Sequence, residues 1–332
     1  MNRYRIELDI LKGLAIIAVV LYHLGILPYG YLGVDTFLVI NGFLIIPSLM
    51  KSSLEANFSF GNWHVRRIGR FLPIVIVASV VCLTIGYFVM IPDDYENLSE
   101  STFASLFFGQ NVLSAITTKD YWNSVNEYRP LMHFWYLGVI VQFYFFLAIL
   151  LSLYRRYLSA YNTKRYLMIL LGVLCIASLI LYLCPISFNT KFYYLPFRIW
   201  EFCIGGIIGI IMLNKEIKIS RLFSIACIVF LLILYSFSPQ SFAEIDTITI
   251  IGAEQVPNME YWSKELLCLL TVLLSSILLF RTKKDLWGRA RWFAIIGKMS
   301  LSIFVWHQIL LAFIRYCFVD KISINIFVIF II

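Results

Sequence analysis

The sequence is poor in charged residues, and this shortage excludes a soluble protein. Only 14% of its 332 residues are charged, whereas 61% are hydrophobic, and the mean hydropathy is +0.85. A soluble domain of this length could not bury so much apolar surface. Several apolar runs approach or exceed the roughly 18 to 20 residues that cross a hydrocarbon core of about 30 Å. The composition therefore predicts a polytopic membrane protein.

The sequence also lacks any cysteine pattern. Its seven cysteines are scattered, mostly within apolar runs, and no two have the CxxC spacing. Neither a disulfide framework nor a metal site follows, so we expect these cysteines to be small core residues. Internal repeats, low-complexity tracts and transporter-like inverted symmetry are missing as well. We expect one membrane domain over residues 1–332, without a fused soluble domain, whose end inside an apolar run suggests C-terminal truncation.

Nine apolar segments are candidate membrane-spanning helices. They are Ile10–Leu27, Val34–Met50, Phe71–Ile91, His133–Leu153, Leu167–Leu183, Tyr193–Leu213, Leu222–Phe237, Leu266–Phe280 and Phe293–Phe313. A tenth run, Ile324–Ile332, is too short to cross a membrane. The first segment is too long for a signal-peptide core and has no small-residue cleavage site, so we expect it to stay as the first helix. The predicted fold class is an all-α membrane bundle of about nine to ten transmembrane helices.

The distribution of basic residues predicts how this bundle is oriented in the membrane. The net charge is +8, and the basic residues gather near positions 66–70, 155–165, 215–221 and 281–291. The positive-inside rule explains this pattern without any nucleic-acid partner, and places the N-terminus in the cytoplasm. All four basic segments are cytoplasmic only if the short apolar stretch Thr102–Ile116 does not cross. The acidic segments Asp93–Pro130 and Pro239–Tyr261 are then external, the first with a re-entrant or interfacial helix.

His23 is the leading candidate for a catalytic residue. It lies in the outer half of the first apolar run, where an ionisable side chain is costly and therefore suggests function. Lys12 precedes it by eleven residues, which on a helix places both on one face, about 16 Å apart. Each residue also has a non-catalytic interpretation. His23 would be a hydrogen-bonded imidazole in the core, and Lys12 a positive charge that sets the membrane topology. Asp35 follows shortly after, and either orients His23 or caps the next helix.

Arg67 and Arg70 are candidates for cofactor binding. They are three residues apart, so on a helix they face the same way. Two guanidinium groups at a cytoplasmic mouth can bind a phosphate or pyrophosphate in bidentate fashion. The alternative is an anchor to anionic lipid headgroups.

Three further polar residues lie within apolar runs. Arg198 and Glu201 have the i,i+3 spacing of an ion pair, which serves either structure or catalysis. His307 is the second histidine inside a predicted span, with a packed, hydrogen-bonded imidazole as its structural alternative.

Several blocks of the sequence, taken in order, resemble the integral-membrane acyltransferase 3 family. They are LDILKGLA at 8–15 with Tyr22-His23, GVDTFLVINGFLI at 33–45, Arg67 with Arg70, FRIWEF at 197–202, and Trp306-His307. The resemblance covers nearly the whole chain. In one place the chain departs from the family pattern, because Ile140 and Val141 stand where family members often have one or two glutamates.

The resemblance implies an O-acyltransferase of the bacterial cell membrane. The donor would be cytoplasmic acetyl-CoA or another acyl-CoA, and the acceptor a hydroxyl of an extracytoplasmic polysaccharide or lipid-linked glycan. It places the essential histidine at His23, with Lys12 as basic partner, and makes Arg67 and Arg70 the important pair. We expect no metal, and membrane lipids as the other partners. The alternatives are a transporter or flippase with His23 and His307 on its path, and an inactive scaffold.

Overall fold

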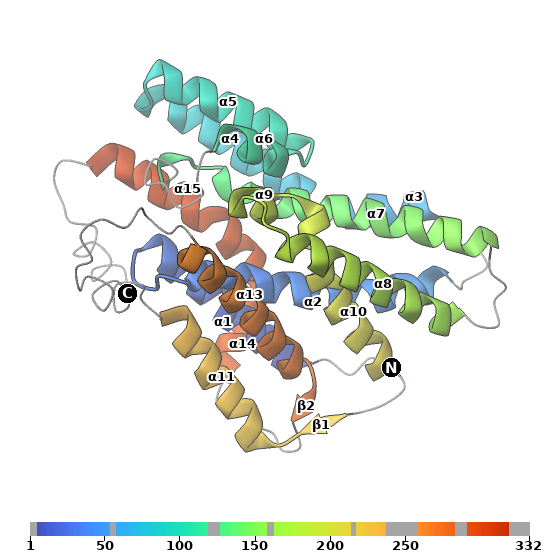
Figure 1. Cartoon of the computed structure of the whole chain (residues 1–332). Coiled ribbons are helices and arrows are strands. Elements are labelled where there is room, and N and C mark those ends of the chain that lie inside the picture. The colour runs from blue at the N-terminus through green and yellow to red at the C-terminus, as the bar shows by residue number, and fades with distance from the viewer. Residues whose placement is uncertain are drawn as a thin grey trace. The chain divides into compact units, whose positions relative to one another are not determined.

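The computed structural model describes residues 5–53, 58–118, 127–157, 163–213, 217–236, 258–282 and 291–318 (Figure 1). Most of these residues are helical, as predicted. The described strands are a parallel pair of two residues each, β1 (Lys218–Ile219) and β2 (Arg281–Thr282). The chain forms two compact units: Met1–Ile40 with Asn214–Ser300, and Asn41–Leu213 with Leu301–Ile332.

Five helical segments in the described part of the chain are long and apolar enough to cross a membrane. They are Gly30–Ser53, Phe60–Val89, Met132–Ser152, Lys164–Leu183 and Ser300–Cys317. This is consistent with an integral membrane protein, although the sequence predicted nine or ten spans. The first helix, α1 (Ile6–His23), has 18 residues but includes three charged ones. The helices α10 (Ile199–Met212) and α11 (Arg221–Ser236) are apolar but shorter.

The first unit is built around α1. Besides α11 it contains η1 (Gly30–Leu32), the start of α2 (Gly33–Ser53), α13 (Asn258–Leu278) and α14 (Arg291–Lys298). α1 packs along α14 with backbone against backbone: a Cβ on Gly13 would collide with the Phe293 carbonyl, and one on Gly297 with the Asp9 carbonyl. Glycine on both helices therefore permits this close crossing.

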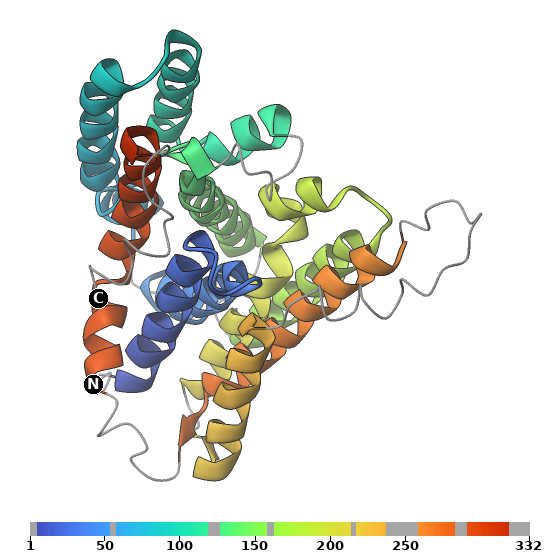
Figure 2. The same cartoon turned by 90° about the vertical axis from the view of Figure 1, so that its left-hand side faces the viewer.

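The second unit contains most of the remaining helices. They are α3 (Phe60–Ile68), α4 (Leu72–Val89), α5 (Pro92–Leu106), α6 (Gln110–Thr117), η3 (Met132–Phe134), α7 (Trp135–Tyr157), α8 (Thr163–Leu183), α9 (Phe188–Tyr193), η5 (Leu195–Phe197), α10 and α15 (Ser300–Phe318). α4 and α5 form an antiparallel hairpin, which Figure 2 shows side by side. The most apolar windows of α4 and α8 are only 28% and 22% buried, so most of their apolar surface faces outward.

Three predicted spans are interrupted or shortened. The apolar stretch Thr102–Ile116, which was not expected to cross, is divided between α5 and α6, because Phe108 adopts a positive φ of 54° before Gly109. Tyr193–Leu213 is broken by η5, and Phe293–Phe313 between α14 and α15. The Ile10–Leu27 prediction is too long, since α1 ends at His23 and Gly25 follows with φ of +73°. The tenth run, Ile324–Ile332, and most of the loop 239–261 lie outside the described residues.

Candidate active site

His23 is the last residue of α1. The left-handed Gly25 ends the helix there, and its N–H donates to the Tyr22 carbonyl at 2.9 Å. The imidazole is half-buried, and its ring meets that of Tyr22 edge to face at 5.1 Å between centroids. The carbonyl groups at a helix C-terminus favour positive charge. His23 therefore lies next to the carbonyl end of α1.

Lys12 lies on the same helix and forms an ion pair that the sequence analysis missed. Its Nζ is 3.3 Å from Oδ1 of Asp9, one turn earlier. The rise from Lys12 to His23 within the continuous α1 is about 16 Å, as expected from their spacing. The i,i+3 rule that was applied to Arg198 and Glu201 would have found Asp9 as well.

Asp35 is buried, with 3% of its surface exposed, in the first turn of α2. Because α2 begins at Gly33, Asp35 is inside the first turn of the helix. It is therefore not the N-cap residue that the alternative interpretation predicted. The next residue, Thr36, is the centre of a buried hydroxyl network. Its Oγ1 lies 2.8 Å from Oγ of Ser275 and 3.0 Å from the hydroxyl of Tyr235. These bonds fix the start of α2 against α11 and α13.

Arg67 and Arg70 do not share a helix face, contrary to the sequence prediction. α3 ends at Ile68, so Arg67 is in its last turn and Arg70 is in the connection to α4. Nη2 of Arg67 donates to Ser48 at 3.1 Å, and its guanidinium lies 5.4 Å from the centre of the Trp63 ring. Arg70 is exposed. The pair thus combines one anchored guanidinium with one accessible to a ligand.

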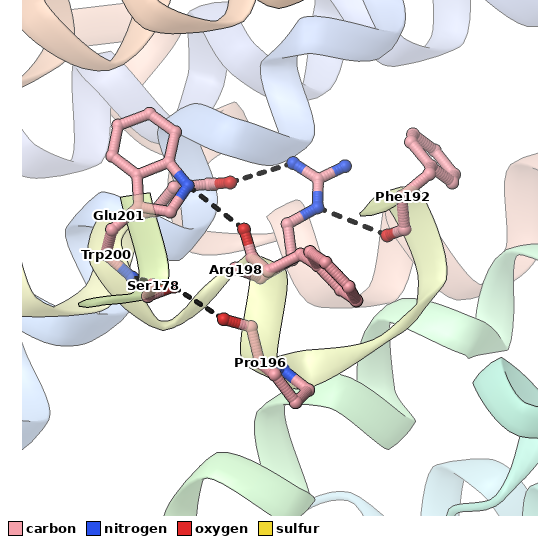
Figure 3. A network of polar contacts seen from close by, with 7 residues as sticks. Ser178, Phe192, Pro196, Arg198, Trp200 and Glu201 are labelled. Carbon is pink, nitrogen blue, oxygen red and sulfur yellow. Dashed lines mark hydrogen bonds and ion pairs between the residues drawn. The ribbon is translucent and has the colours of Figure 1, made fainter. Parts of the chain in front are cut away.

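Arg198 and Glu201 form an ion pair in the interior of the second unit (Figure 3). Nη1 of Arg198 is 2.8 Å from Oε1 of Glu201, and both residues are at most 2% exposed. Nε of Arg198 donates to the Phe192 carbonyl at 3.1 Å. Burial of this kind costs free energy unless each charge is paired and hydrogen-bonded. The contacts join α9 to α10 across η5, and so favour the structural interpretation of the pair.

Ser178 reinforces the same junction from α8. Its hydroxyl donates to the Pro196 carbonyl at 2.6 Å and accepts from the Trp200 N–H at 3.1 Å (Figure 3). The backbone groups that become available where η5 interrupts the apolar run are therefore satisfied by side chains.

His307 pairs with a histidine to which the sequence analysis gave no role. The ring centroids of His133 and His307 are 5.2 Å apart, and both residues are buried. Nε2 of His133 lies 3.0 Å from the Val305 carbonyl, and Nδ1 of His307 lies 3.0 Å from the Ile303 carbonyl. The two residues are far apart in the sequence, and no spacing rule connects them.

Ile140 and Val141 are buried apolar residues of α7, each 2% exposed. The adjacent Gln142 makes the polar contacts of this region: its Nε2 donates to the Phe108 carbonyl at 3.2 Å and to Oδ1 of Asn111 at 2.8 Å. The amide thus satisfies the carbonyl exposed by the break between α5 and α6.

The structure divides the predicted site residues between the two units. The first unit holds Lys12, His23 and Asp35, and the second holds Arg67, Arg70, Arg198, Glu201 and His307. Of the predicted pairs, Arg198 and Glu201 are in contact, and Lys12 and His23 share a helix.

Comparison with known proteins finds the family that the sequence motifs resemble. The model of the acyltransferase 3 family, described as an acyltransferase domain, matches residues 5–332. The O-acetyltransferase OatA of Staphylococcus aureus (strain NCTC 8325 / PS 47) is 25% identical over 338 residues, which cover 96% of this chain and 52% of its own. The peptidoglycan O-acetyltransferase OatA of Listeria monocytogenes is 31% identical over 176 residues, 52% of this chain and 28% of its own. The chain spans about half the length of the curated relatives it matches end to end. No solved structure matches it.

Proposed function

Since its family model matches residues 5–332, the chain belongs to the acyltransferase 3 family, and we propose that it is a membrane O-acyltransferase. It transfers an acetyl group from cytoplasmic acetyl-CoA to a hydroxyl of an extracytoplasmic polysaccharide or related glycan. The family match carries this proposal, and favours it over a transporter. The name of the Listeria monocytogenes relative, a peptidoglycan O-acetyltransferase, supports a cell-wall glycan as acceptor.

The proposed topology brings donor and acceptor from opposite sides of a bacterial cytoplasmic membrane. The N-terminus and the basic segments face the cytoplasm, and the nine to ten predicted helices form one membrane domain. Arg67 and Arg70 bind the phosphates of acetyl-CoA on the cytoplasmic side. The exposed Arg70 supplies the accessible charge, and the anchored Arg67 holds a fixed donor group.

His23 is the proposed catalytic residue. As general base, its imidazole takes the proton of the acceptor hydroxyl while the hydroxyl oxygen attacks the thioester carbonyl. The C–S bond then breaks, and the departing CoA sulfur receives the proton from the imidazolium. In the covalent alternative the imidazole takes the acetyl group first and passes it to the acceptor. The position of His23 at the C-terminus of α1 supports either route, because both pass through a positively charged ring.

Lys12 and Asp35 are proposed as positioning residues. Lys12 is held by Asp9 on the helix that carries His23. Asp35 is fixed at the start of α2 beside the Thr36 network and orients the imidazole.

The test is to express the wild type and His23→Ala and to measure acetate esters on the surface glycan by mass spectrometry. Loss of a positioned base predicts a decrease of at least about a hundredfold. His64→Ala is the control, because the contacts described for the His64 ring are with the rings of Trp63 and Phe145, and it has no proposed role. The amount of each variant in the membrane is measured in parallel. Unchanged ester in His23→Ala would refute the mechanism.

A further inference from the structure

A cavity with a mixed polar and apolar lining opens in the second unit at the end of the α4–α5 hairpin. Its volume is about 530 Å³, within the usual range of roughly 300 to 1,000 Å³ for small-molecule sites. Its wall is formed by the end of α4, the first turns of α5, the segment 128–131 and the last turns of α15. None of the residues proposed above for catalysis or donor binding lines it.

The lining combines hydrogen-bonding groups with aromatic rings. The hydroxyl of Tyr316 donates to Oδ2 of Asp94 at 2.8 Å, and Asn97 and Arg129 lie on the same wall. The rings of Tyr128 and Tyr316 meet edge to face, with centroids 5.5 Å apart. The cavity therefore offers an acceptor carboxylate, an amide, hydroxyl groups and a guanidinium next to apolar ring surface.

The wall is held in place before any ligand binds. Arg315, which precedes Tyr316, forms an ion pair with Glu127 at 3.2 Å and donates to its carbonyl at 3.1 Å. Gln308 donates to the same carbonyl at 3.0 Å. These contacts fasten the segment that carries Tyr128 to α15. Such preorganisation is typical of binding sites, because it reduces the entropy lost on binding.

The charge of the cavity indicates which ligand it fits. Among the described residues that line it, Asp94 and Arg129 are the charged ones, and they carry one charge of each sign. A multiply anionic ligand such as coenzyme A gains little there, whereas a purely apolar ligand would leave the polar groups unsatisfied. A neutral polyhydroxylated molecule with apolar faces matches the lining. That is the chemistry of a carbohydrate.

The position of the cavity along α4 is consistent with binding of the acceptor substrate. The 18 residues of α4 span about 27 Å, with Arg70 just before the helix and Met90, a lining residue, just after it. The proposed donor site and the cavity thus lie at opposite ends of α4, which is long enough to cross a membrane. Resting on the proposed function and its topology, we infer that this cavity binds the saccharide acceptor on the outer face, with Asp94 and Tyr316 as its central hydrogen-bonding pair.

The test uses the full chain in lipid nanodiscs, with chitotetraose and a peptidoglycan disaccharide as probes. Binding is measured by calorimetry without acetyl-CoA, and acetyl transfer in a separate assay. Asp94→Asn should weaken saccharide binding and raise the acceptor KM about tenfold, because a hydrogen bond to a charged carboxylate becomes one to a neutral amide, while the KM for acetyl-CoA stays constant. Asp93→Asn is the matched control, since Asp93 is exposed in the same first turn and does not line the cavity.

A second variant, Asn97→Phe, fills the cavity from an exposed helix position without removing the Asp94–Tyr316 bond, and should abolish saccharide binding. Equal saccharide binding by wild type, Asp94→Asn and Asn97→Phe would overturn the inference, as would the failure of the wild type to bind either probe. If the wild type binds saccharide, the variants lose it and no acetyl ester forms, the cavity assignment stands and the proposed acyltransferase function fails.

Discussion

The two arginines proposed to bind the donor are held by the protein in different ways. Arg67 is half-buried, bonded to Ser48 and placed against Trp63, whereas Arg70 is exposed in the connection between α3 and α4. Their i,i+3 spacing indicated a shared helix face, but α3 ends between them. The cause is local: residue 69 is a glycine, followed shortly by Pro73 in the first turn of α4, and this combination favours a helix boundary.

This difference predicts separable effects of Arg67→Ala and Arg70→Ala. Each should raise the KM for acetyl-CoA at least about tenfold, because each removes a charge-assisted hydrogen bond to phosphate. Arg67→Ala should in addition lower the melting temperature, since it also removes the contacts with Ser48 and Trp63. Steady-state kinetics and thermal unfolding in detergent measure the two effects.

Arg66→Ala is the matched control for this pair. Arg66 is exposed on the same helix, and its side chain contacts only the Asn62 carbonyl among the bonds described. A rise of the acetyl-CoA KM in Arg66→Ala equal to that in Arg70→Ala would mean that the segment binds anionic surfaces without selectivity. The lipid-anchor alternative would then be favoured.

At the scale of elements, the sequence predicts where the helices lie more accurately than where they begin, end or break. α2, α4, α7 and α8 each begin and end within about four residues of the predicted spans, because uninterrupted apolar runs dominate their sequences. The breaks at η5 and between α14 and α15 were missed, since hydrophobicity continues through them. At η5 a tertiary contact compensates for the break, because Ser178 of α8 donates to the Pro196 carbonyl.

The crossing of α1 and α14 predicts opposite effects for two glycine substitutions. Gly13→Ala should destabilise the protein by several kcal/mol, because the new Cβ meets the Phe293 backbone and cannot be accommodated by a side-chain rotation. Gly172→Ala in α8 should stabilise by up to about 1 kcal/mol, since that Cβ meets nothing within 4 Å and alanine favours the helix. Thermal unfolding of both variants measures this; destabilisation of equal size would contradict a close α1–α14 contact.

At the scale of the whole molecule, the sequence predicted the class of protein more readily than its site. Low charge and high hydropathy are enough to predict a membrane protein. The order of the sequence motifs is enough to predict the family. The contact of His133 with His307 and the cavity beside Asp94 could not be predicted, because each joins segments far apart in the chain. In the sequence Asp94 stood out only as one member of the acidic segment Asp93–Pro130.

The orientation in the membrane is the prediction on which both proposals depend. In a Cys175→Ser/Cys184→Ser/Cys317→Ser background, which removes the two partly exposed thiols and the exposed one, Glu96→Cys and Arg165→Cys place single reporters on exposed sites of α5 and α8. A membrane-impermeant maleimide should label Glu96→Cys in intact cells, because the proposed topology puts the acidic α5 outside. It should label Arg165→Cys only after the cells are permeabilised, because the same topology puts the basic start of α8 in the cytoplasm. The reverse pattern would put Arg67 and Arg70 outside, where cytoplasmic acetyl-CoA cannot reach them, and would refute the donor site and the acceptor cavity together.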